Sequence, residues 1–241
     1  MCTVSFISSG DKFIITSNRD ENMHRASSQR PVTEVINGIR VTFPKDPRAG
    51  GTWFAINENG TITVLLNGAF VKHHHTGNYA RSRGLILLEI CGTSSPLMHF
   101  EEMDLENIEP FTVILFDQAR LWELRWDGNK KYRHDLDIRG NYIWSSSTLY
   151  SPDVIAQREE LFAAFIERDQ LDEMSVIDFH SNNHSDFQNG FIIDRNENLK
   201  TLSITQAVAQ ENEVQLAHHD LLKNLRYEVP VAVQPHNFRA H

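Results

Sequence analysis

Four times along this chain, two short runs rich in β-branched and aromatic residues are separated by a turn. Such a pair of runs predicts a β-hairpin. The predicted hairpins join 3–7 to 12–17, 53–57 to 61–66, the two halves of 111–126, and the two ends of 190–204, with a turn at 194–198. Strand pairs of this length cannot bury their apolar faces alone. The pattern therefore predicts mainly antiparallel sheets that pack against other elements.

Helical segments are predicted between these hairpins. Residues 80–90 group their apolar side chains on one side, although Gly84 disfavours a helix there. Residues 151–169 give the clearest helix, with Ser151 as N-cap and Pro152 at the first helical position. A shorter helix is predicted over 172–179. Strand pairs grouped around helices predict an α+β fold in which helices cover the sheets.

The composition limits the classes of function. The 241 residues contain no repeat, low-complexity tract or linker, so one domain over 1–241 is expected. The net charge of −9 disfavours nucleic acid as a partner. No run of about eighteen apolar residues and no secretory signal is present, which predicts a cytoplasmic protein without an integral membrane segment. Only Cys2 and Cys91 occur, too few for a disulfide framework, and Cys91 is expected in the core.

The first hairpin brings the chain terminus beside a polar cluster that follows the second strand. If Ser9-Gly10 forms a two-residue turn, Cys2 faces Ser17. If Gly10 is the centre of a three-residue turn, Cys2 faces Asn18. Either register predicts that the terminus lies next to the segment 18–20.

A cysteine at position 2 can act as a nucleophile. Removal of the initiator methionine, which is normal before a small residue, would give Cys2 a free α-amino group with a pKa near 8 next to a thiol with a pKa near 8.5. The amine can then accept the thiol proton. Asp20 can orient the amine, Arg19 can favour a thiolate or a substrate carboxylate, and Asn67 can stabilise an oxyanion. The structural alternative is a small apolar residue at a strand start beside a capped strand end.

The segments MCTVSFI, SNRDEN, GGTWFAIN, VLLNGA and ARSRG together resemble, in this order, the NRDE family, also called the TANGO2-like or transport-and-Golgi-organisation-2 family. The family is similar to N-terminal-nucleophile hydrolases with a catalytic cysteine. The resemblance implies a four-layer α/β/β/α sandwich and a Cys2 nucleophile that cleaves a carbon–nitrogen amide bond of a small molecule. Its eukaryotic members imply an alternative, a non-catalytic binding or trafficking protein for haem, acyl-CoA or a related amphipathic ligand.

The resemblance also implies which residues form the site. The catalytic set is Cys2, Arg19, Asp20 and Asn67. The expected substrate-binding set is Asn18, Glu21, Trp53, Arg83, Ser146 and Asn189. Two positions depart from the family pattern, because Ser146 stands where an asparagine is expected and Asn189 lies near the position of an expected arginine. A pocket that is less cationic than in bile-salt hydrolases is therefore expected.

Three further features are interpreted as structural. The run His73-His74-His75 is expected in a solvated loop near the pocket and not as a metal site, and no metal or cofactor is predicted. His218-His219 is expected on a helix or loop surface. Trp122 and Trp126 are expected to share one strand face, and Asp46 is expected to shape a turn.

Overall fold

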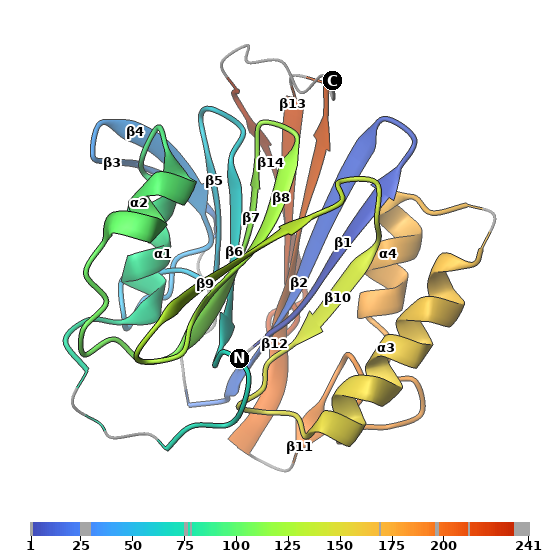
Figure 1. The fold of residues 1–241 in the computed structure, drawn as a ribbon. Helices are drawn as coiled ribbons and strands as arrows, with labels where there is room; N and C mark the ends of the chain where they lie inside the picture. Colours follow the sequence, from blue (N-terminus) through green and yellow to red (C-terminus); the bar gives the residue numbers. More distant parts are fainter. Residues whose placement is uncertain are drawn as a thin grey trace.

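The structure is a computed structural model that describes residues 2–24, 30–74, 77, 79–168, 170–195, 198–211 and 213–233; the side chain of Cys2 is outside this description. Two antiparallel sheets form the centre of the molecule (Figure 1). The first sheet contains, in spatial order, β10 (Tyr142–Ser145), β1 (Cys2–Ser9), β2 (Lys12–Asn22), β12 (Leu199–Gln210), β13 (Glu213–Asp220) and β14 (Leu225–Val231), with β11 (Asp194–Arg195) also paired to β12. The second contains β3 (Val32–Ile36), β4 (Ile39–Phe43), β5 (Phe54–Asn57), β6 (Ile62–Asn67), β7 (Phe111–Asp117), β8 (Arg120–Trp126) and β9 (Lys131–Leu136).

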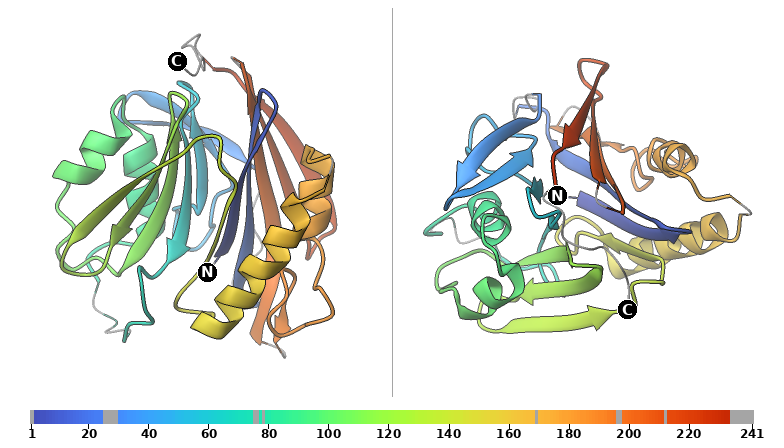
Figure 2. Two further views of the ribbon diagram at one scale, coloured as in Figure 1. Left: turned by 45° about the vertical axis from the view of Figure 1, so that its right-hand side comes forward. Right: turned by 90° about the horizontal axis from the view of Figure 1, so that it is seen from above.

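The helices cover the outer faces of the two sheets. Helices α1 (Arg83–Cys91) and α2 (Pro96–Glu102) lie on the second sheet, and α3 (Pro152–Ile166) and α4 (Glu173–His180) lie on the first (Figure 2). The order of layers is therefore α/β/β/α. This confirms the predicted α+β sandwich with mainly antiparallel sheets.

Three apolar clusters hold these layers together. The largest fills the space between the sheets, where Val4, Phe6 and Ile15 pack with residues of β6, β7 and β8. On the other face of the first sheet, Ile7 and Ile14 pack with α3, α4 and Phe191. Adjacent strand residues thus point to opposite layers, as the strand repeat of two requires. A third cluster contains Cys91 and joins α1 to β4 and β5.

The first hairpin differs from both predicted registers. Its turn is Gly10-Asp11, so Ser9 pairs with Lys12 and Cys2 lies opposite Arg19. Both predictions were wrong because the turn lies further along the chain than either assumed. Gly10 has a φ of 62°, which suits the first position of a two-residue hairpin turn. The prediction that Cys2 lies at a strand start is confirmed.

The sequence patterns missed several elements. The segment 213–231 forms two strands, so the expectation that His218 and His219 lie on a helix or loop surface was wrong. Strands β3, β4, β9 and β10 and helix α2 were not predicted either. Trp122 and Trp126 are both buried, and Cys91 is completely buried in the core. Burial raises the pKa of the Cys91 thiol to about 12, which makes it a poor nucleophile.

Candidate active site

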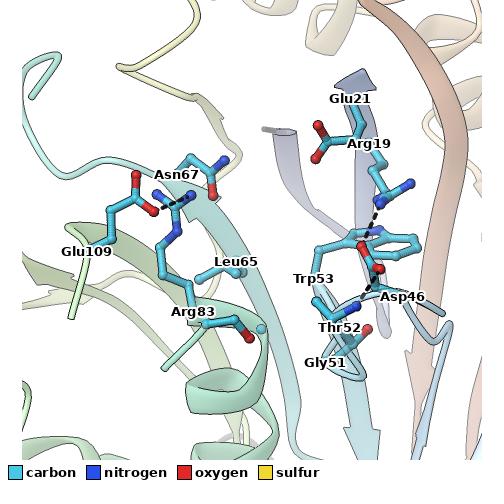
Figure 3. A pocket seen from close by; sticks show the side chains of 13 residues that line it. Arg19, Glu21, Asp46, Gly51, Thr52, Trp53, Leu65, Asn67, Arg83 and Glu109 are labelled. Atoms are coloured by element: carbon cyan, nitrogen blue, oxygen red, sulfur yellow. Dashed lines mark hydrogen bonds and ion pairs between the residues drawn. The ribbon is translucent and has the colours of Figure 1, made fainter. Parts of the chain in front are cut away.

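A cavity of about 170 Å³ lies where β2 and β6 come together with the segment 46–53, which precedes β5, and with the start of α1. Two ion pairs form opposite sides of this first cavity, with Leu65 between them (Figure 3). The charged groups that line it are two arginines and three acidic side chains, and they carry no excess of positive formal charge. The lining contains Arg19, Glu21, Asp46, Gly51, Thr52, Trp53, Leu65, Asn67, Arg83 and Glu109, with Ala49, Ser82 and Gly84.

Arg19 is fixed on one side of the cavity by two contacts. Its side chain is only 3% exposed, and Nη2 donates to Oδ2 of Asp46 at 2.9 Å. Its guanidinium carbon lies 4.4 Å from the centre of the Trp53 ring, a cation–π contact. Asp46 also accepts backbone hydrogen bonds from Arg48 and Ala49 through its other oxygen. Asp46 therefore shapes its turn, as predicted, and in addition neutralises a buried cation.

The strand repeat divides the predicted polar cluster between two layers. Arg19 points between the sheets, toward Trp53. Asn18 points toward the helices, where its amide donates to the carbonyl oxygens of His180 and Phe191, both at 2.9 Å. Its side-chain oxygen contacts Nδ1 of His180. Asn18 therefore fastens α4 to the sheet and does not line the cavity.

Asp20 also points away from the cavity, into a buried polar network. Its two oxygens accept hydrogen bonds from Oη of Tyr150 at 2.8 Å and from Oγ1 of Thr201 at 2.7 Å. Thr201 lies at an irregularity in the pairing of β12 with β2. Burial raises the pKa of the Asp20 carboxyl above its usual value, and Arg158, Thr201 and Tyr150 each lower it. Asp20 is thus a buried carboxyl whose charge depends on its neighbours.

Arg158 is the cation that most lowers the pKa of Asp20, and the sequence patterns did not identify it. It lies on α3, is 1% exposed, and its guanidinium stacks 3.7 Å from the Tyr150 ring centre. Its nitrogens donate to Oγ1 of Thr3 and, at 3.1 Å, to Oγ of Ser145. Arg158 therefore ties helix α3 to β1 and β10, next to the backbone of position 2.

Two glycines explain why separate motifs meet at the cavity. A Cβ placed on Gly51 would lie 2.5 Å from the carbonyl carbon of Gly84, and one on Gly84 would lie 2.8 Å from the oxygen of Thr52. The backbone of the 50–53 turn thus packs directly on the first turn of α1. Gly50 has a φ of 70°, which completes this turn. Trp53 and Arg83 reach one cavity only because no side chain separates the two segments.

Arg83 and Glu109 form the opposite side of the cavity. Nη2 of Arg83 lies 3.0 Å from Oε2 of Glu109, and Nη1 donates to the carbonyl oxygen of Pro110 at 3.2 Å. Nε2 of His73 contacts Oε1 of the same Glu109 at 3.1 Å. His73 thus contacts a residue of the cavity lining but does not line the cavity itself. His74 is exposed, and His75 lies outside the described residues.

Asn67 separates the first cavity from a second one of about 210 Å³. It is the last residue of β6, and its carbonyl oxygen accepts a hydrogen bond from Oγ of Ser146 at 2.7 Å. Ser146 lines the second cavity, together with Asn67 itself. Asn189 lies in neither lining; its side chain contacts Arg195 and Asp186, at 2.9 Å and 3.2 Å.

The structure thus brings together five of the predicted residues, Arg19, Glu21, Trp53, Asn67 and Arg83, around one cavity. The backbone of Cys2 lies beside this group through its pairing with Arg19, whereas its side chain is outside the described residues. Asp46 and Glu109, which sequence patterns did not assign to the site, complete the two ion pairs. Among the described residues, no group of three or more histidine, cysteine, aspartate or glutamate side chains is placed to hold a metal ion.

The fold is that of N-terminal-nucleophile hydrolases. A variant of conjugated bile acid hydrolase from Clostridium perfringens superposes with a TM-score of 0.63, at 12% identity over 95% of this chain and 92% of that one. An N-acylethanolamine-hydrolyzing acid amidase ortholog from Caenorhabditis elegans gives a TM-score of 0.60, at 13% identity over 85% of this chain and 92% of that one. At these identities the similarity concerns the fold alone.

The sequence pattern of Transport and Golgi organisation 2 matches residues 1–223, so the chain belongs to the TANGO2 family. No curated protein sequence matches the chain. Within the described part of the chain, no helix is both long and apolar enough to cross a membrane.

Proposed function

We propose that this protein is a cysteine N-terminal-nucleophile hydrolase that cleaves the carbon–nitrogen bond of a small-molecule amide. The observation that carries the proposal is the pairing of Cys2 with Arg19 at the end of β1. This pairing brings the first residue of a processed chain next to the cavity that Arg19 and Asn67 line. The fold similarity to two amide hydrolases supports the same reaction class.

The proposed reaction has two steps. The α-amino group of Cys2 takes the thiol proton, and the sulfur attacks the amide carbon to form a tetrahedral intermediate. The carbon–nitrogen bond then breaks, and the departing amine takes a proton from the α-ammonium group. Water then attacks the resulting thioester, with the α-amino group of Cys2 as base. This step releases a carboxylic acid and restores the thiol.

The neighbouring residues have distinct roles in this proposal. Asn67 donates its side-chain amide to the oxyanion. Cys2 pairs with Arg19, and Asp20 is the next residue along β2. In a mature chain that begins at Cys2, the Asp20 carboxylate is proposed to orient the α-amino group. Arg19, fixed by Asp46 and Trp53, is a pre-organised cation beside the reacting atoms. Glu21, Trp53 and Arg83 are proposed to contact the substrate from the cavity wall.

A carrier of haem, acyl-CoA or a similar amphipathic ligand is the second candidate. The observation that favours it is that position 146 is a serine. The Ser146 hydroxyl donates a hydrogen bond to the carbonyl oxygen of Asn67, so this position offers the site no second side-chain amide. A site with one amide donor is poorer in oxyanion stabilisation than one with two.

The substitution Cys2→Ser separates the two candidates. A hydroxyl in place of the thiol keeps the amine and the approximate size but is a much weaker nucleophile. For a hydrolase, amide turnover falls by orders of magnitude while unfolding is unchanged. For a carrier, turnover is absent from the wild type, and haem or acyl-CoA affinity changes only a few-fold unless the thiolate itself binds haem iron. Equal turnover by both proteins would refute the nucleophile assignment.

A further inference from the structure

A cavity of about 540 Å³ lies on the outer, helix-bearing face of the first sheet; we call it the outer cavity. Helix α4 packs on β2 and β12. Beside the start of this helix, side chains of β12, β13 and β14 form the floor of the outer cavity. Among the described residues, none lines both this cavity and the first one. The outer cavity is therefore separate from the candidate active site.

One end of the cavity floor offers a buried amide oxygen. Gln206 is 3% exposed, and its Nε2 donates to Oγ1 of Thr16 at 3.1 Å and to the carbonyl oxygen of Glu173 at 3.0 Å. A carbonyl oxygen only accepts, so the second bond fixes which atom of the amide is nitrogen. Oε1 of Gln206 has no hydrogen-bond partner within the described part of the chain, and the residue lines the outer cavity. A buried acceptor without a partner is unfavourable, so a ligand that donates an N–H here is stabilised.

The other end of the floor carries a carboxylate. Glu213 is exposed, lines the cavity and lies opposite Gln210 on β12. Its side chain has no ion pair or hydrogen bond with the residues that the structure describes. Gln206 and Gln210 are four residues apart on one strand, so about 13 Å separates the two ends of the floor.

The other charges of the lining form two ion pairs. Nζ of Lys12 lies 3.3 Å from Oε2 of Glu173, and Nη2 of Arg226 lies 2.9 Å from Oε1 of Glu228. The described lining thus contains three acidic and two basic side chains, and Glu213 is the acidic one in excess. The net charge of −9 for the whole chain adds a field that attracts cations.

The middle of the floor is apolar. Between the two ends, Val208 on β12 and Pro230 on β14 line the cavity, and each pairs with the same residue of β13. Met174, at the start of α4, is 48% exposed and lines the cavity as well. Ala217 lies opposite Gln206, and its small side chain leaves room beside the Gln206 amide. An aliphatic chain can therefore bury its methylene groups between the two polar ends.

We propose that the outer cavity binds a linear aliphatic diamine. One ammonium group pairs with Glu213, the methylene chain lies over Val208 and Pro230, and the second amine donates to Oε1 of Gln206. With C–C bonds of about 1.5 Å, a straight diamine of roughly eight to ten carbons spans the floor. This binding site goes beyond the proposed amide hydrolysis and does not depend on Cys2.

Calorimetric titration of the full wild-type chain with straight-chain diamines tests this site. The series runs from diaminobutane to diaminododecane, and octylamine is the matched ligand with a single amine. We expect diaminooctane or diaminodecane to bind at least tenfold more tightly than diaminobutane, because the short diamine cannot reach both acceptors. The same diamine should bind at least tenfold more tightly than octylamine, which lacks the second amine.

Two substitutions locate the bound diamine. Glu213→Gln removes the carboxylate at an exposed position and should weaken binding of the diamine by at least fivefold. Ala217→Leu fills the space beside Gln206 and should weaken binding by a similar factor, with urea unfolding as the check that the fold is kept. Glu106→Gln is the matched control, because Glu106 is an exposed carboxylate outside the cavity lining.

The outcomes distinguish a built site from attraction by net charge. A preference for the matching length that Glu213→Gln and Ala217→Leu reduce and Glu106→Gln does not supports the site, whether or not the protein hydrolyses amides. Absence of binding, or equal affinities for all diamines and octylamine, would overturn the proposal. An equal loss of affinity in Glu106→Gln would overturn it too, because the diamine would then respond only to the overall charge of the protein.

Discussion

At the scale of single residues, Arg158 affects the site through several contacts and through the pKa of Asp20. It is a completely buried cation that binds Thr3 and Ser145, stacks on Tyr150 and lowers the pKa of Asp20. Burial opposes the charged form of Asp20, so this carboxylate depends on Arg158 for its charge. Arg158 is therefore a positioning residue in the proposed mechanism, because it acts on the amine of Cys2 only through Asp20 and the start of β1.

Replacing Arg158 tests this role. Arg158→Met leaves buried acceptors without a donor, and we expect the free energy of unfolding to fall by roughly 3 kcal/mol. It also raises the pKa of Asp20 further, so the acid limb of the kcat/KM profile moves to higher pH. Arg158→Lys keeps a charge and should move the limb less, although it cannot reproduce the several hydrogen bonds of the guanidinium. An acid limb that is the same in all three proteins would contradict this role.

At the scale of elements, the contact between Gly51 and Gly84 positions the cavity. The 50–53 turn and the start of α1 touch through backbone atoms, and Arg83 lies directly beside this contact. The turn that carries Trp53 and the helix start that carries Arg83 thereby line one cavity, although they lie about thirty residues apart in the sequence. The two backbones lie so close together that no side chain fits between them.

The substitution Gly51→Ala tests this contact. A Cβ at 2.5 Å from a backbone carbon forces the two segments apart, so we expect a stability loss of roughly 2–3 kcal/mol and a larger KM. Gly10→Ala is the matched control. Its φ of 62° makes alanine strained, but nothing lies near its Cβ, so stability falls by about 1 kcal/mol and KM stays constant. A KM increase in the control, or none in Gly51→Ala, would show that the contact does not position the site.

Local patterns in the sequence predicted three hairpins and three helices because turn residues and apolar spacing are local signals. The fourth hairpin was placed wrongly: 190–193 form no strand, and β11 (Asp194–Arg195) lies within the expected turn. The patterns did not predict β13 and β14, whose alternating polar residues include buried His218 and Asp220. They also placed Asn18, Arg19 and Asp20 together, whereas strand alternation sends Arg19 to one layer and the other two to the opposite one. Asp46 and Arg158 were missed as site residues because their partners lie far away in the sequence.

At the scale of the whole molecule, two buried histidines lie on opposite faces of the first sheet. His180 lies on the helical side, where Nε2 contacts Oγ of Ser5 at 2.7 Å. His218 lies between the sheets, where Nδ1 contacts Oγ1 of Thr205 at 2.8 Å. Burial lowers the pKa of His180 to about 3 and that of His218 to about 4. Both rings are therefore neutral in the folded protein at neutral pH.

These histidines predict how stability depends on pH. Unfolding restores a pKa near 6.5, so below that pH the unfolded chain binds protons that the folded chain does not. Stability is thus fully present above about pH 6.5 and is lost as the pH falls toward 4, by about 1.4 kcal/mol per pH unit for each histidine. Urea unfolding of wild type, His218→Gln and His134→Gln as an exposed control measures the slope. A slope that His218→Gln does not reduce would contradict this explanation.

The most direct test of the central claim is the mass of the intact protein during reaction with a slowly hydrolysed amide or a thioester-forming ester. The account predicts a starting mass that lacks Met1 and a transient increase equal to the acyl group, located by peptide mapping on Cys2 and absent from Cys2→Ser. A protein that retains Met1, or that hydrolyses the amide with no acyl group ever attached to Cys2, would contradict it.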